Sequence, residues 1–235
     1  MTYGTTTTHH DLGKWGRVSF EQWDHPHEHR KEFTERDVDY LAQFIDPGDI
    51  AVDIGAFTGD TALPMAVASG NRGQVHAFEP NPASLRVLLK NSIANSTIAQ
   101  TLVYPYAIGL VRDTSIFRYH CNQINGGALT HGDPVTVRRI PLDDLFPMDM
   151  PLAFVKIDCE GEDGDLLEHY TQWLRNHGSP VVQVERFPTL NQNQEQQLWK
   201  AIVRYGTPSL KDDWTFTELK ELPSTLVDII IKPHA

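Results

Sequence analysis

Apolar and polar positions follow two different periods along this chain. Short runs such as "DIAVDIG" and "LAFVKIDCEG" are largely apolar and contain β-branched residues. Longer segments between them, such as "DGDLLEHYTQWLRNHG", repeat their apolar positions at helical spacing. The first pattern predicts buried strands and the second predicts amphipathic helices. Because the two alternate, we expect an α/β fold in which helices cover both faces of a mostly parallel sheet.

Glycine, proline and capping residues set the expected boundaries. Helices are predicted at 34–45, 59–70, 81–95, 163–178 and 193–206. Strands are predicted at 49–55, 73–80, 101–110, 114–120, 135–146 (with a turn), 152–161, 179–187, 214–222 and 225–233. The last two should close the sheet as an antiparallel pair. Asn81 is placed to cap the third helix, with Pro82 at its first position.

Residues 1–33 differ from the rest of the chain, since they are polar and rich in His and Thr. We expect them to form an irregular N-terminal arm, and residues 34–235 to form one domain. This polar arm contains three aromatic residues whose rings need to be shielded from water, Trp15, Phe20 and Trp23. We therefore hypothesise that the arm folds as a lid over the mouth of a ligand site.

Composition and charge narrow the class of protein. The chain has 235 residues, of which 40% are hydrophobic. Its net charge of −11 argues against a uniformly basic surface for nucleic acid and against binding to anionic membranes. Its two cysteines, Cys121 and Cys159, form no Cys-x-x-Cys pair, so reduced thiols are expected. No apolar run suggests a signal peptide or a membrane span. We expect a cytoplasmic protein with a small-molecule partner, and no nucleic acid or membrane; the oligomeric state is open.

Two strand ends carry a candidate ligand site. The first buried strand ends in "VDIGAFTG", where Gly55 and Gly59 allow a tight turn into a helix. The second ends in "FEPN", which places Glu79 roughly 20 residues after the turn, where an acid can hydrogen-bond ribose hydroxyls. Ligands of open parallel sheets bind at such carboxyl ends. Either signal alone is weak, but the two in this order predict a nucleoside cofactor.

The glycine spacing also bears on the type of cofactor. It is Gly-x-x-x-Gly, and neither the dinucleotide pattern nor a Walker-type phosphate loop is present. Asp53 would repel a pyrophosphate, whereas it favours a cationic ligand, directly or through water. S-adenosylmethionine carries a sulfonium and an ammonium group beside its nucleoside. Electrostatics therefore favour S-adenosylmethionine over NAD.

Several motifs together resemble the class I S-adenosylmethionine-dependent methyltransferases, and more closely the FkbM family. They are "VDIGAFTGDTAL", "VHAFEPNPASLRVLLKN", "YAIG", "IPLDDLF" and "FVKIDCEGEDGDLLE", which occur in the family's order over residues 34–187. The combination of "FEPNP" followed by "VKIDCEG" is specific. Two departures are visible: Phe57 stands where the family commonly has Asn, and Cys159 and Glu162 replace the usual Val and Ala.

The resemblance implies a Rossmann-like three-layer sandwich whose seven-stranded sheet has a reversed final strand. It also implies O-methylation of a hydroxyl on a sugar, glycoside or natural product. The methionine part of the cofactor would lie near Asp53, Gly55, Ala56, Phe57 and Gly59. The ribose and adenine would lie near Glu79, Pro80, Asn81 and Ala107, with Asp158 beside the reacting centre.

Methyl transfer to a hydroxyl needs a general base, or a metal ion that acidifies the hydroxyl. Strand alternation puts Lys156, Asp158 and Glu160 on one side of their strand, and Glu185 follows a strand at the same sheet edge. Lys156 could act as a base only if burial lowered its pKa, and an ion pair is the favoured role. His131, in a glycine-bearing loop, is a further candidate base. Glu162 and Asp163 are expected to cap the next helix.

Three alternatives stay open. Asp158, Glu160 and Glu185 could hold Mg²⁺ in a metal-dependent enzyme of the same fold. The chain could instead be a nucleoside-binding regulatory protein without turnover. A nicotinamide oxidoreductase is disfavoured because the pyrophosphate glycines are missing. The acceptor is not readable from the sequence, because its determinants would lie in the arm, the loop around Gly126 and Gly127, and other irregular segments.

Overall fold

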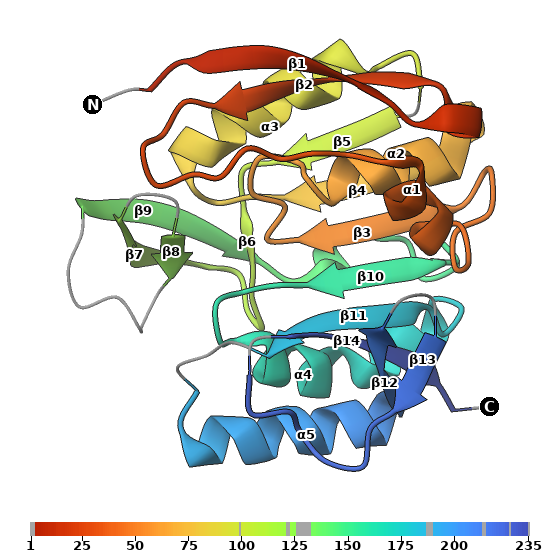
Figure 1. Ribbon diagram of the computed structural model, residues 1–235. Helices are drawn as coiled ribbons and strands as arrows, with labels where there is room; N and C mark the ends of the chain where they lie inside the picture. The colour runs from red at the N-terminus through yellow and green to blue at the C-terminus, as the bar shows by residue number, and fades with distance from the viewer. Residues whose placement is uncertain are drawn as a thin grey trace.

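A large central sheet dominates the structure, a computed structural model that describes residues 3–98, 100–120, 123–125, 133–186, 190–212, 215–225 and 227–234. Within these ranges the central sheet has eight strands (Figure 1). From one edge to the other they are β13 (Thr215–Glu218), β12 (Gly206–Asp212), β14 (Val227–Pro233), β11 (Val181–Arg186), β10 (Phe154–Ile157), β3 (Ile50–Ile54), β4 (Gln74–Phe78) and β5 (Gln100–Tyr104). Neighbours from β11 through β5 run parallel, so the expected α/β class is confirmed.

The antiparallel end of the sheet partly corrects the sequence prediction. β14 runs opposite to both of its neighbours, so the reversed final strand is confirmed, while β13 adds one strand to the seven expected. The predicted pairing of 214–222 with 225–233 is wrong, because β12 lies between β13 and β14 and pairs with both. β12 has the sequence "GTPSLKD", whose proline and few apolar residues hide a strand from pattern rules.

Helices cover both faces of the sheet, as expected. On one face lie α1 (Glu35–Leu41), α2 (Ala62–Ser69) and α3 (Pro82–Ala94), which share a core with sheet residues such as Val75 and Phe154. On the other lie α4 (Asp163–Asn176) and α5 (Gln192–Tyr205), which pack on residues such as Val52 and Val184. Asn81 caps α3 as predicted, since its side chain accepts a hydrogen bond from the Ala83 amide at 3.0 Å. Helix α1 ends at Leu41, earlier than predicted.

A smaller sheet stands beside the central one (Figure 1). Within the described residues its strands are β6 (Ala107–Ile108), β9 (Asp133–Ile140), β7 (Asp113–His120) and β8 (Gln123–Asn125), in that order. The segment 101–110, predicted as one strand and its exit, is therefore divided between β5 and β6, which belong to different sheets. Short 3-10 helices η2 (Gly70–Arg72) and η3 (Leu142–Asp144) follow α2 and β9.

The N-terminal residues are ordered, which corrects the prediction of an irregular arm. β1 (Thr5–Asp11) and β2 (Arg17–Trp23) form an antiparallel hairpin around η1 (Gly13–Trp15). Val18 and Phe20 are buried on one side of β2 and pack into the core beneath α3. Their alternation with polar residues is short, and the sequence pattern alone did not reveal it.

Helix α3 also satisfies the backbone of the hairpin. The Asn91 side chain accepts a hydrogen bond from the Glu21 amide at 2.6 Å, and the Asn95 side chain accepts one from the Ser19 amide at 3.1 Å. Asn95 also donates to the Ser19 carbonyl at 2.7 Å. Unpaired edges of strands invite association with other chains. Here two amide side chains, one helical turn apart, cover part of the β2 edge.

No helix in the described part of the chain combines the length and apolar character that crossing a membrane requires.

Candidate functional site

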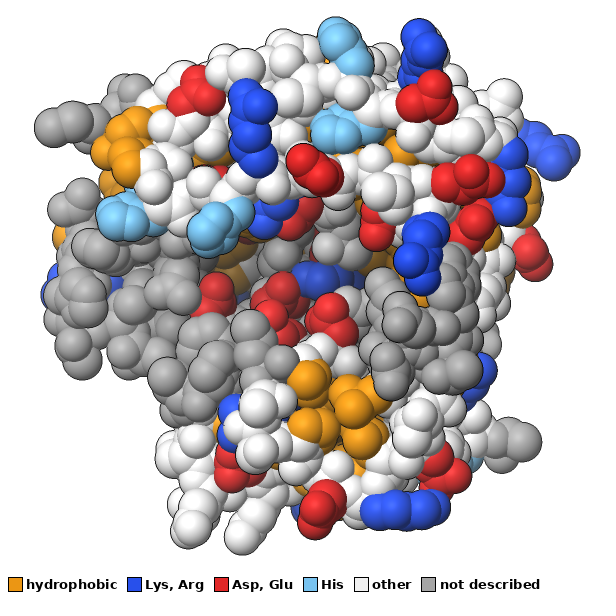
Figure 2. Space-filling view, viewed as in Figure 1, with side chains coloured by type: hydrophobic (Ala, Val, Ile, Leu, Met, Phe, Trp, Pro, Cys, Tyr) orange, Lys and Arg blue, Asp and Glu red, His pale blue; other side chains and the backbone are white. Residues whose placement is uncertain are grey.

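A cavity of about 550 Å³ lies at the carboxyl ends of β3, β4, β10 and β11. Residues from β6 and β7 and from the segment after β2 complete its wall. Figure 2 shows the hollow near the middle of the face, with acidic side chains gathered around a basic one. The parallel strands bring these ends together at one edge, which is where ligands of such sheets bind.

Gly55 is required where the first strand enters this site. It has a φ of 84°, and a Cβ atom on it would lie 1.9 Å from the carbonyl oxygen of Asp158. A side chain here would push β3 and β10 apart, so the glycine serves strand packing as well as the turn. The amides of Gly55 and Ala56 both donate to the Phe78 carbonyl, at 3.0 and 2.9 Å, which ties the turn to β4.

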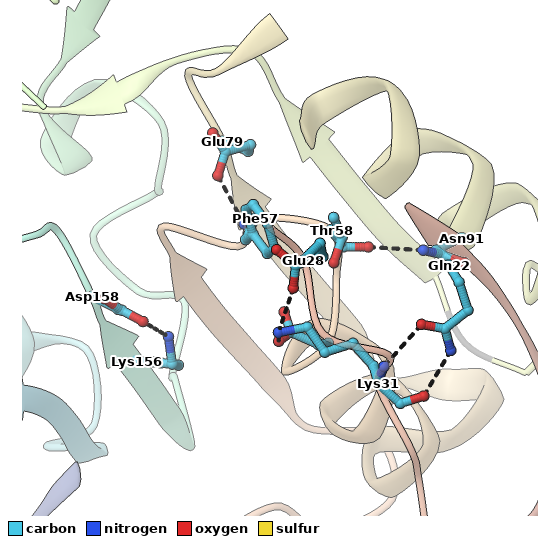
Figure 3. A network of polar contacts seen from close by, with 10 residues as sticks. Gln22, Glu28, Lys31, Phe57, Thr58, Glu79, Asn91, Lys156 and Asp158 are labelled. Carbon is cyan, nitrogen blue, oxygen red and sulfur yellow. Dashed lines mark hydrogen bonds and ion pairs between the residues drawn. The ribbon is translucent and has the colours of Figure 1, made fainter. Parts of the chain in front are cut away.

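Glu79 is held in place by the turn that faces it. One carboxylate oxygen accepts a hydrogen bond from the Phe57 amide at 2.8 Å (Figure 3). The other accepts one from the Asn81 amide at 2.6 Å. The residue is only 3% exposed but lines the cavity. Burial raises the pKa of Glu79 to about 8, against the opposing effect of the two amides. Its oxygens keep lone pairs with which to accept hydrogen bonds from ligand hydroxyls.

Asp53 is fully buried and does not reach the cavity wall. Within the described residues, neither of its oxygens accepts a well-formed hydrogen bond, although the Ala62 amide helps to lower its pKa. Burial outweighs that effect and the attraction of Lys156, so the pKa of Asp53 is raised to about 7. Lys156 is its partner across β3 and β10. The buried Asp53 therefore lies next to Lys156, which lines the cavity.

Lys156 and Asp158 form an ion pair, with 2.6 Å between Nζ and Oδ2 (Figure 3). The Lys156 side chain is only 9% exposed. Burial alone would lower the pKa of Lys156, but the carboxylates of Asp158 and Asp53 reverse the effect and raise it. The lysine stays protonated, so it can orient Asp158 or bind an anionic oxygen, but it cannot take a proton at neutral pH.

Besides Glu79, Glu160 and Glu185 are wall carboxyls whose pKa lies near neutral pH, as proton transfer requires. Burial, with repulsion from Asp158, raises the pKa of Glu160 to about 7. One Glu160 oxygen is buried and accepts no hydrogen bond within the described residues. Burial and Asp158 also raise the pKa of Glu185 to about 8. A base is most effective when its pKa lies near the working pH, so Glu160 has the better-matched pKa.

The sequence-predicted site residues divide into two groups. The cavity wall includes Gly55, Phe57, Glu79, Pro80, Ala107, Lys156, Asp158, Glu160 and Glu185. Behind the wall lie Asp53, Ala56, Gly59 and Asn81. His131 lies outside the described residues, as does the loop around Gly126 and Gly127.

Two residues expected to cap α4 have other contacts. Glu162 occupies the N-cap position of α4 as expected, but its side chain makes no capping hydrogen bond and lines the cavity. Asp163 accepts hydrogen bonds from the amides of Cys159 and Gly161, at 3.3 and 3.2 Å. It thereby holds the loop after β10 in the bent form that brings Asp158 and Glu160 to the wall.

The sequence did not reveal the contribution of the segment after β2. Lys31 lines the cavity, and its Nζ lies 2.9 Å from Asp60 and 3.1 Å from Glu28 (Figure 3). The Gln22 side chain accepts a hydrogen bond from the Lys31 backbone amide at 2.8 Å and donates one to the Lys31 backbone carbonyl at 2.7 Å. No local motif marks Lys31, because its partners come from separate parts of the chain.

Of the three aromatic residues expected in a lid, only Trp23 reaches a residue of the cavity wall. Its ring lies 5.9 Å from that of Phe57. Phe20 is buried in the core, and the Trp15 ring nitrogen donates to Asp39 at 2.8 Å. The expectation that all three cover the site is therefore wrong for Phe20 and Trp15.

No group of three or more His, Cys, Asp or Glu side chains within the described residues has the arrangement of a metal site.

Comparison with known proteins gives a family and a fold. The family model of the methyltransferase FkbM domain matches residues 53–207, more than half of the chain. No curated protein matches closely enough to count as a relative.

Solved structures with a similar fold include methyltransferases. A SAM-dependent O-methyltransferase from Thermotoga maritima is 11% identical with a TM-score of 0.52, covering 99% of this chain and 79% of its own. A proposed rRNA methylase from Clostridium thermocellum is 12% identical with a TM-score of 0.51, covering 86% and 95%. TYW2 from P. horikoshii, solved with MeSAdo, is 12% identical with a TM-score of 0.50, covering 98% and 70%. At such identities the likeness concerns the fold, and it confirms the expected Rossmann-like methyltransferase architecture.

Proposed function

Because the chain belongs to the FkbM family of methyltransferases, we propose that it is an S-adenosylmethionine-dependent O-methyltransferase. Its acceptor would be a hydroxyl of a sugar, a glycoside or a natural-product small molecule. One observation carries the proposal: a single cavity is lined both by Glu79, suited to a ribose, and by the carboxyls Asp158 and Glu160. These residues would set a nucleoside site and a proton-accepting site next to each other, as methyl transfer to a hydroxyl requires.

The residues on the cofactor side fit S-adenosylmethionine. Glu79 would accept hydrogen bonds from the ribose hydroxyls, and Pro80, Ala107 and Ile108 offer apolar surface to the adenine. Gly55 would let the backbone come close to the methionine part. When bound, the cofactor supplies a methyl group on a sulfonium centre, and transfer to an acceptor oxygen leaves a thioether and releases the hydroxyl proton. The excess of carboxylates on the wall favours this cation.

Glu160 would take the proton of the acceptor hydroxyl. It follows β10, its pKa is raised by burial to about 7, and one of its oxygens is buried without a hydrogen-bond partner in the described structure. Asp158 would orient the acceptor while Lys156 holds its carboxylate at 2.6 Å. A carboxylate largely removed from water is a stronger base than an exposed one.

The charge of the molecule supports a small acceptor rather than a nucleic acid. The chain carries a net charge of −11 and the described cavity wall holds eight carboxyls against two lysines, so a phosphate backbone would be repelled. We further propose a cytoplasmic location, which is supported by the low cysteine content.

Calorimetric titration of the full chain with S-adenosylmethionine, S-adenosylhomocysteine and NAD tests the cofactor. We expect binding of the first two and none of NAD. Binding of NAD without S-adenosylhomocysteine would overturn the proposal.

A screen of hydroxylated sugars and natural products, read out as S-adenosylhomocysteine formation, tests the reaction. Each reaction is run with a chelator and with added Mg²⁺. We expect turnover under both conditions. Turnover only with Mg²⁺ would replace the proposal with the metal-dependent version. Cofactor binding with no turnover of any acceptor would favour a regulatory nucleoside-binding protein.

A further inference from the structure

The cavity wall carries an uneven distribution of charge. Among the described residues, eight carboxyl side chains line the cavity and two lysines oppose them. An apolar group, Ile54, Phe78, Pro80, Ala107 and Ile108, lies on the side of the cavity near β4 and β6. Apart from Glu79, the carboxyls come from the other strand ends and from the segment after β2. The part of the cavity left for an acceptor is therefore strongly acidic.

Both lysines already have carboxylate partners. Lys156 Nζ lies 2.6 Å from Asp158, and Lys31 Nζ lies 2.9 Å from Asp60 and 3.1 Å from Glu28 (Figure 3). The wall thus binds two ammonium groups of the protein itself, each through carboxylates. Neither of the two lysines forms an ion pair with Glu185.

Glu185 lies at the acidic end of the cavity, among other carboxyls. Within the described residues it makes no hydrogen bond or ion pair, yet it lines the cavity at the end of β11. Its neighbour across the antiparallel pair is Asp228 of β14, which lines the cavity as well. Burial first, and then the charges of Asp158, Asp228 and Asp163, raise the pKa of Glu185, while Lys156 opposes the shift. Like charges crowded away from water are stabilised by a cation.

We propose that the acceptor carries a protonated amine close to the hydroxyl that is methylated, and that Glu185, beside Asp228, binds this ammonium group. The inference rests on the proposed methyltransferase function and narrows its substrate class to amino sugars and related amino alcohols. A neutral polyol at this place would offer the partly buried Glu185 side chain no opposite charge. An ammonium group supplies both the charge and three hydrogen-bond donors.

The strand order sets the amine and the hydroxyl at a suitable separation. β11, which carries Glu185, pairs directly with β10, which leads into Asp158 and Glu160. Neighbouring strands lie about 4.8 Å apart. An ammonium group at Glu185 therefore lies one strand away from the carboxylates that would receive the hydroxyl, which matches an amine on a nearby carbon of the same ring or chain.

A second cavity provides room for the rest of such an acceptor. It has a volume of about 310 Å³ and lies against α1 and α2. Asp228, Gln183, Lys31 and Asp60 line both cavities, so the two adjoin. An acceptor anchored beside Asp228 can extend into this second space while its hydroxyl stays at the end of β10.

Paired probes that differ in one amine test the inference. The full chain is titrated with glucosamine against glucose, and with ethanolamine against ethylene glycol, with and without S-adenosylhomocysteine, by ligand-observed NMR. The amine of each pair is expected to bind at least roughly tenfold more tightly than its hydroxyl counterpart, because it gains a charge-assisted hydrogen bond. Equal binding within both pairs, or no binding of any probe, overturns the inference.

Two variants assign the effect to Glu185. Glu185→Gln should reduce the amine's advantage to nearly nothing while leaving S-adenosylhomocysteine binding and the thermal midpoint unchanged. Glu218→Gln removes the same charge from an exposed site on β13, outside the cavity, and should keep the advantage. An advantage that survives Glu185→Gln would refute the assignment.

A failure of the methyltransferase function and a failure of the amine site give different results. If wild-type protein does not bind S-adenosylhomocysteine, the proposed function fails. If it does bind and the amines have no advantage, only the amine site fails. A titration with Mg²⁺ alone completes the set: Mg²⁺ binding that Glu185→Gln abolishes, with no preference for amines, would show a metal site instead.

Discussion

Phe57 adopts a left-handed backbone conformation, with a φ of 48°, at the position where the resembling family commonly has Asn. Asn enters this region more readily than an aromatic residue does. The Phe57 amide nevertheless donates to Glu79, and its ring contacts Trp23 and lies 5.5 Å from Lys31 Nζ. These contacts offset the backbone cost, and they connect the glycine turn with the N-terminal hairpin and the segment that follows it.

Replacement of Glu79 tests the cofactor assignment at this scale. Glu79→Gln should weaken S-adenosylhomocysteine binding by roughly tenfold or more, because an NH2 donor replaces one of the two oxygens that accept from the Phe57 and Asn81 amides, which leaves fewer lone pairs for the ribose hydroxyls. Calorimetry measures the affinity, and the circular dichroism spectrum checks that the fold is retained. Affinity close to that of the wild type, with the fold intact, would remove Glu79 from the cofactor site.

The pH dependence of turnover tests the base. Glu160 acts as a base only when ionised, and its pKa is about 7 because of burial and Asp158. The rate of methyl transfer, measured at a cofactor concentration well below KM, should therefore fall as the pH decreases through about 7. Glu160→Gln should lower kcat by roughly a hundredfold and remove this limb of the profile. An unchanged profile in the variant would assign the proton transfer to another group.

At the scale of elements, the N-terminal hairpin supports a segment that lines the cavity. They precede the family match at residues 53–207, yet Glu28 and Lys31 line the cavity. The hairpin is attached to α3 by Asn91 and Asn95, and Gln22 fixes the backbone of Lys31. We propose that this segment closes over the acceptor side as a lid, with Lys31 as the contact that holds it.

Removal of the Lys31 charge tests the lid. Lys31→Met breaks its pairs with Asp60 and Glu28, so KM for the acceptor should rise by roughly threefold to tenfold, with little change in S-adenosylhomocysteine affinity. Lys14→Met is the matched control, because Lys14 pairs with Asp39 at an exposed site away from the cavity. Equal kinetics for the two variants would contradict a role for the segment in closure.

For the whole molecule, the same sheet supports two apolar cores and a polar cluster at its carboxyl edge. Asp53, Glu79 and Asp163 are each almost fully buried there. Burial raises their pKa values to about 7, 8 and 7, far above the ordinary values of 3.8, 4.5 and 3.8. The molecule therefore keeps several acids protonated near neutral pH unless a cation compensates them.

This arrangement predicts how stability depends on pH. Because the folded state holds these protons more tightly than the unfolded state, the free energy of unfolding should fall as the pH rises from about 4.5 to about 8. Carboxyls with a lowered pKa, such as Glu21 and Asp113, act in the opposite direction only around and below 4.5. His76, whose pKa burial lowers from 6.5 to about 4, offsets part of the fall between these two values. Urea denaturation at a series of pH values measures the slope, which Glu79→Gln should reduce. A free energy that increases over this window would contradict the prediction.

The regular elements were largely predictable because each depends on residues that are close together in the sequence. The buried strands β3, β4 and β10 and the helices α3 and α4 follow from periodicity and caps, and Glu79 from its place after the second strand. β12 and the N-terminal hairpin were missed, because their apolar alternation is short and their stability comes from partners elsewhere, such as β14 and α3.

By itself, the sequence determined the alternating α/β pattern, the glycine turn, and an acid at the end of the second strand. Only the tertiary structure decided which of these residues reach the cavity. It buried Asp53 next to Lys156, brought Lys31 to Asp60, and set Glu185 outside the ion pairs of both lysines. The physical reason is that burial and charge pairing depend on distances between residues far apart in the chain, whereas periodicity and capping depend on neighbours along it.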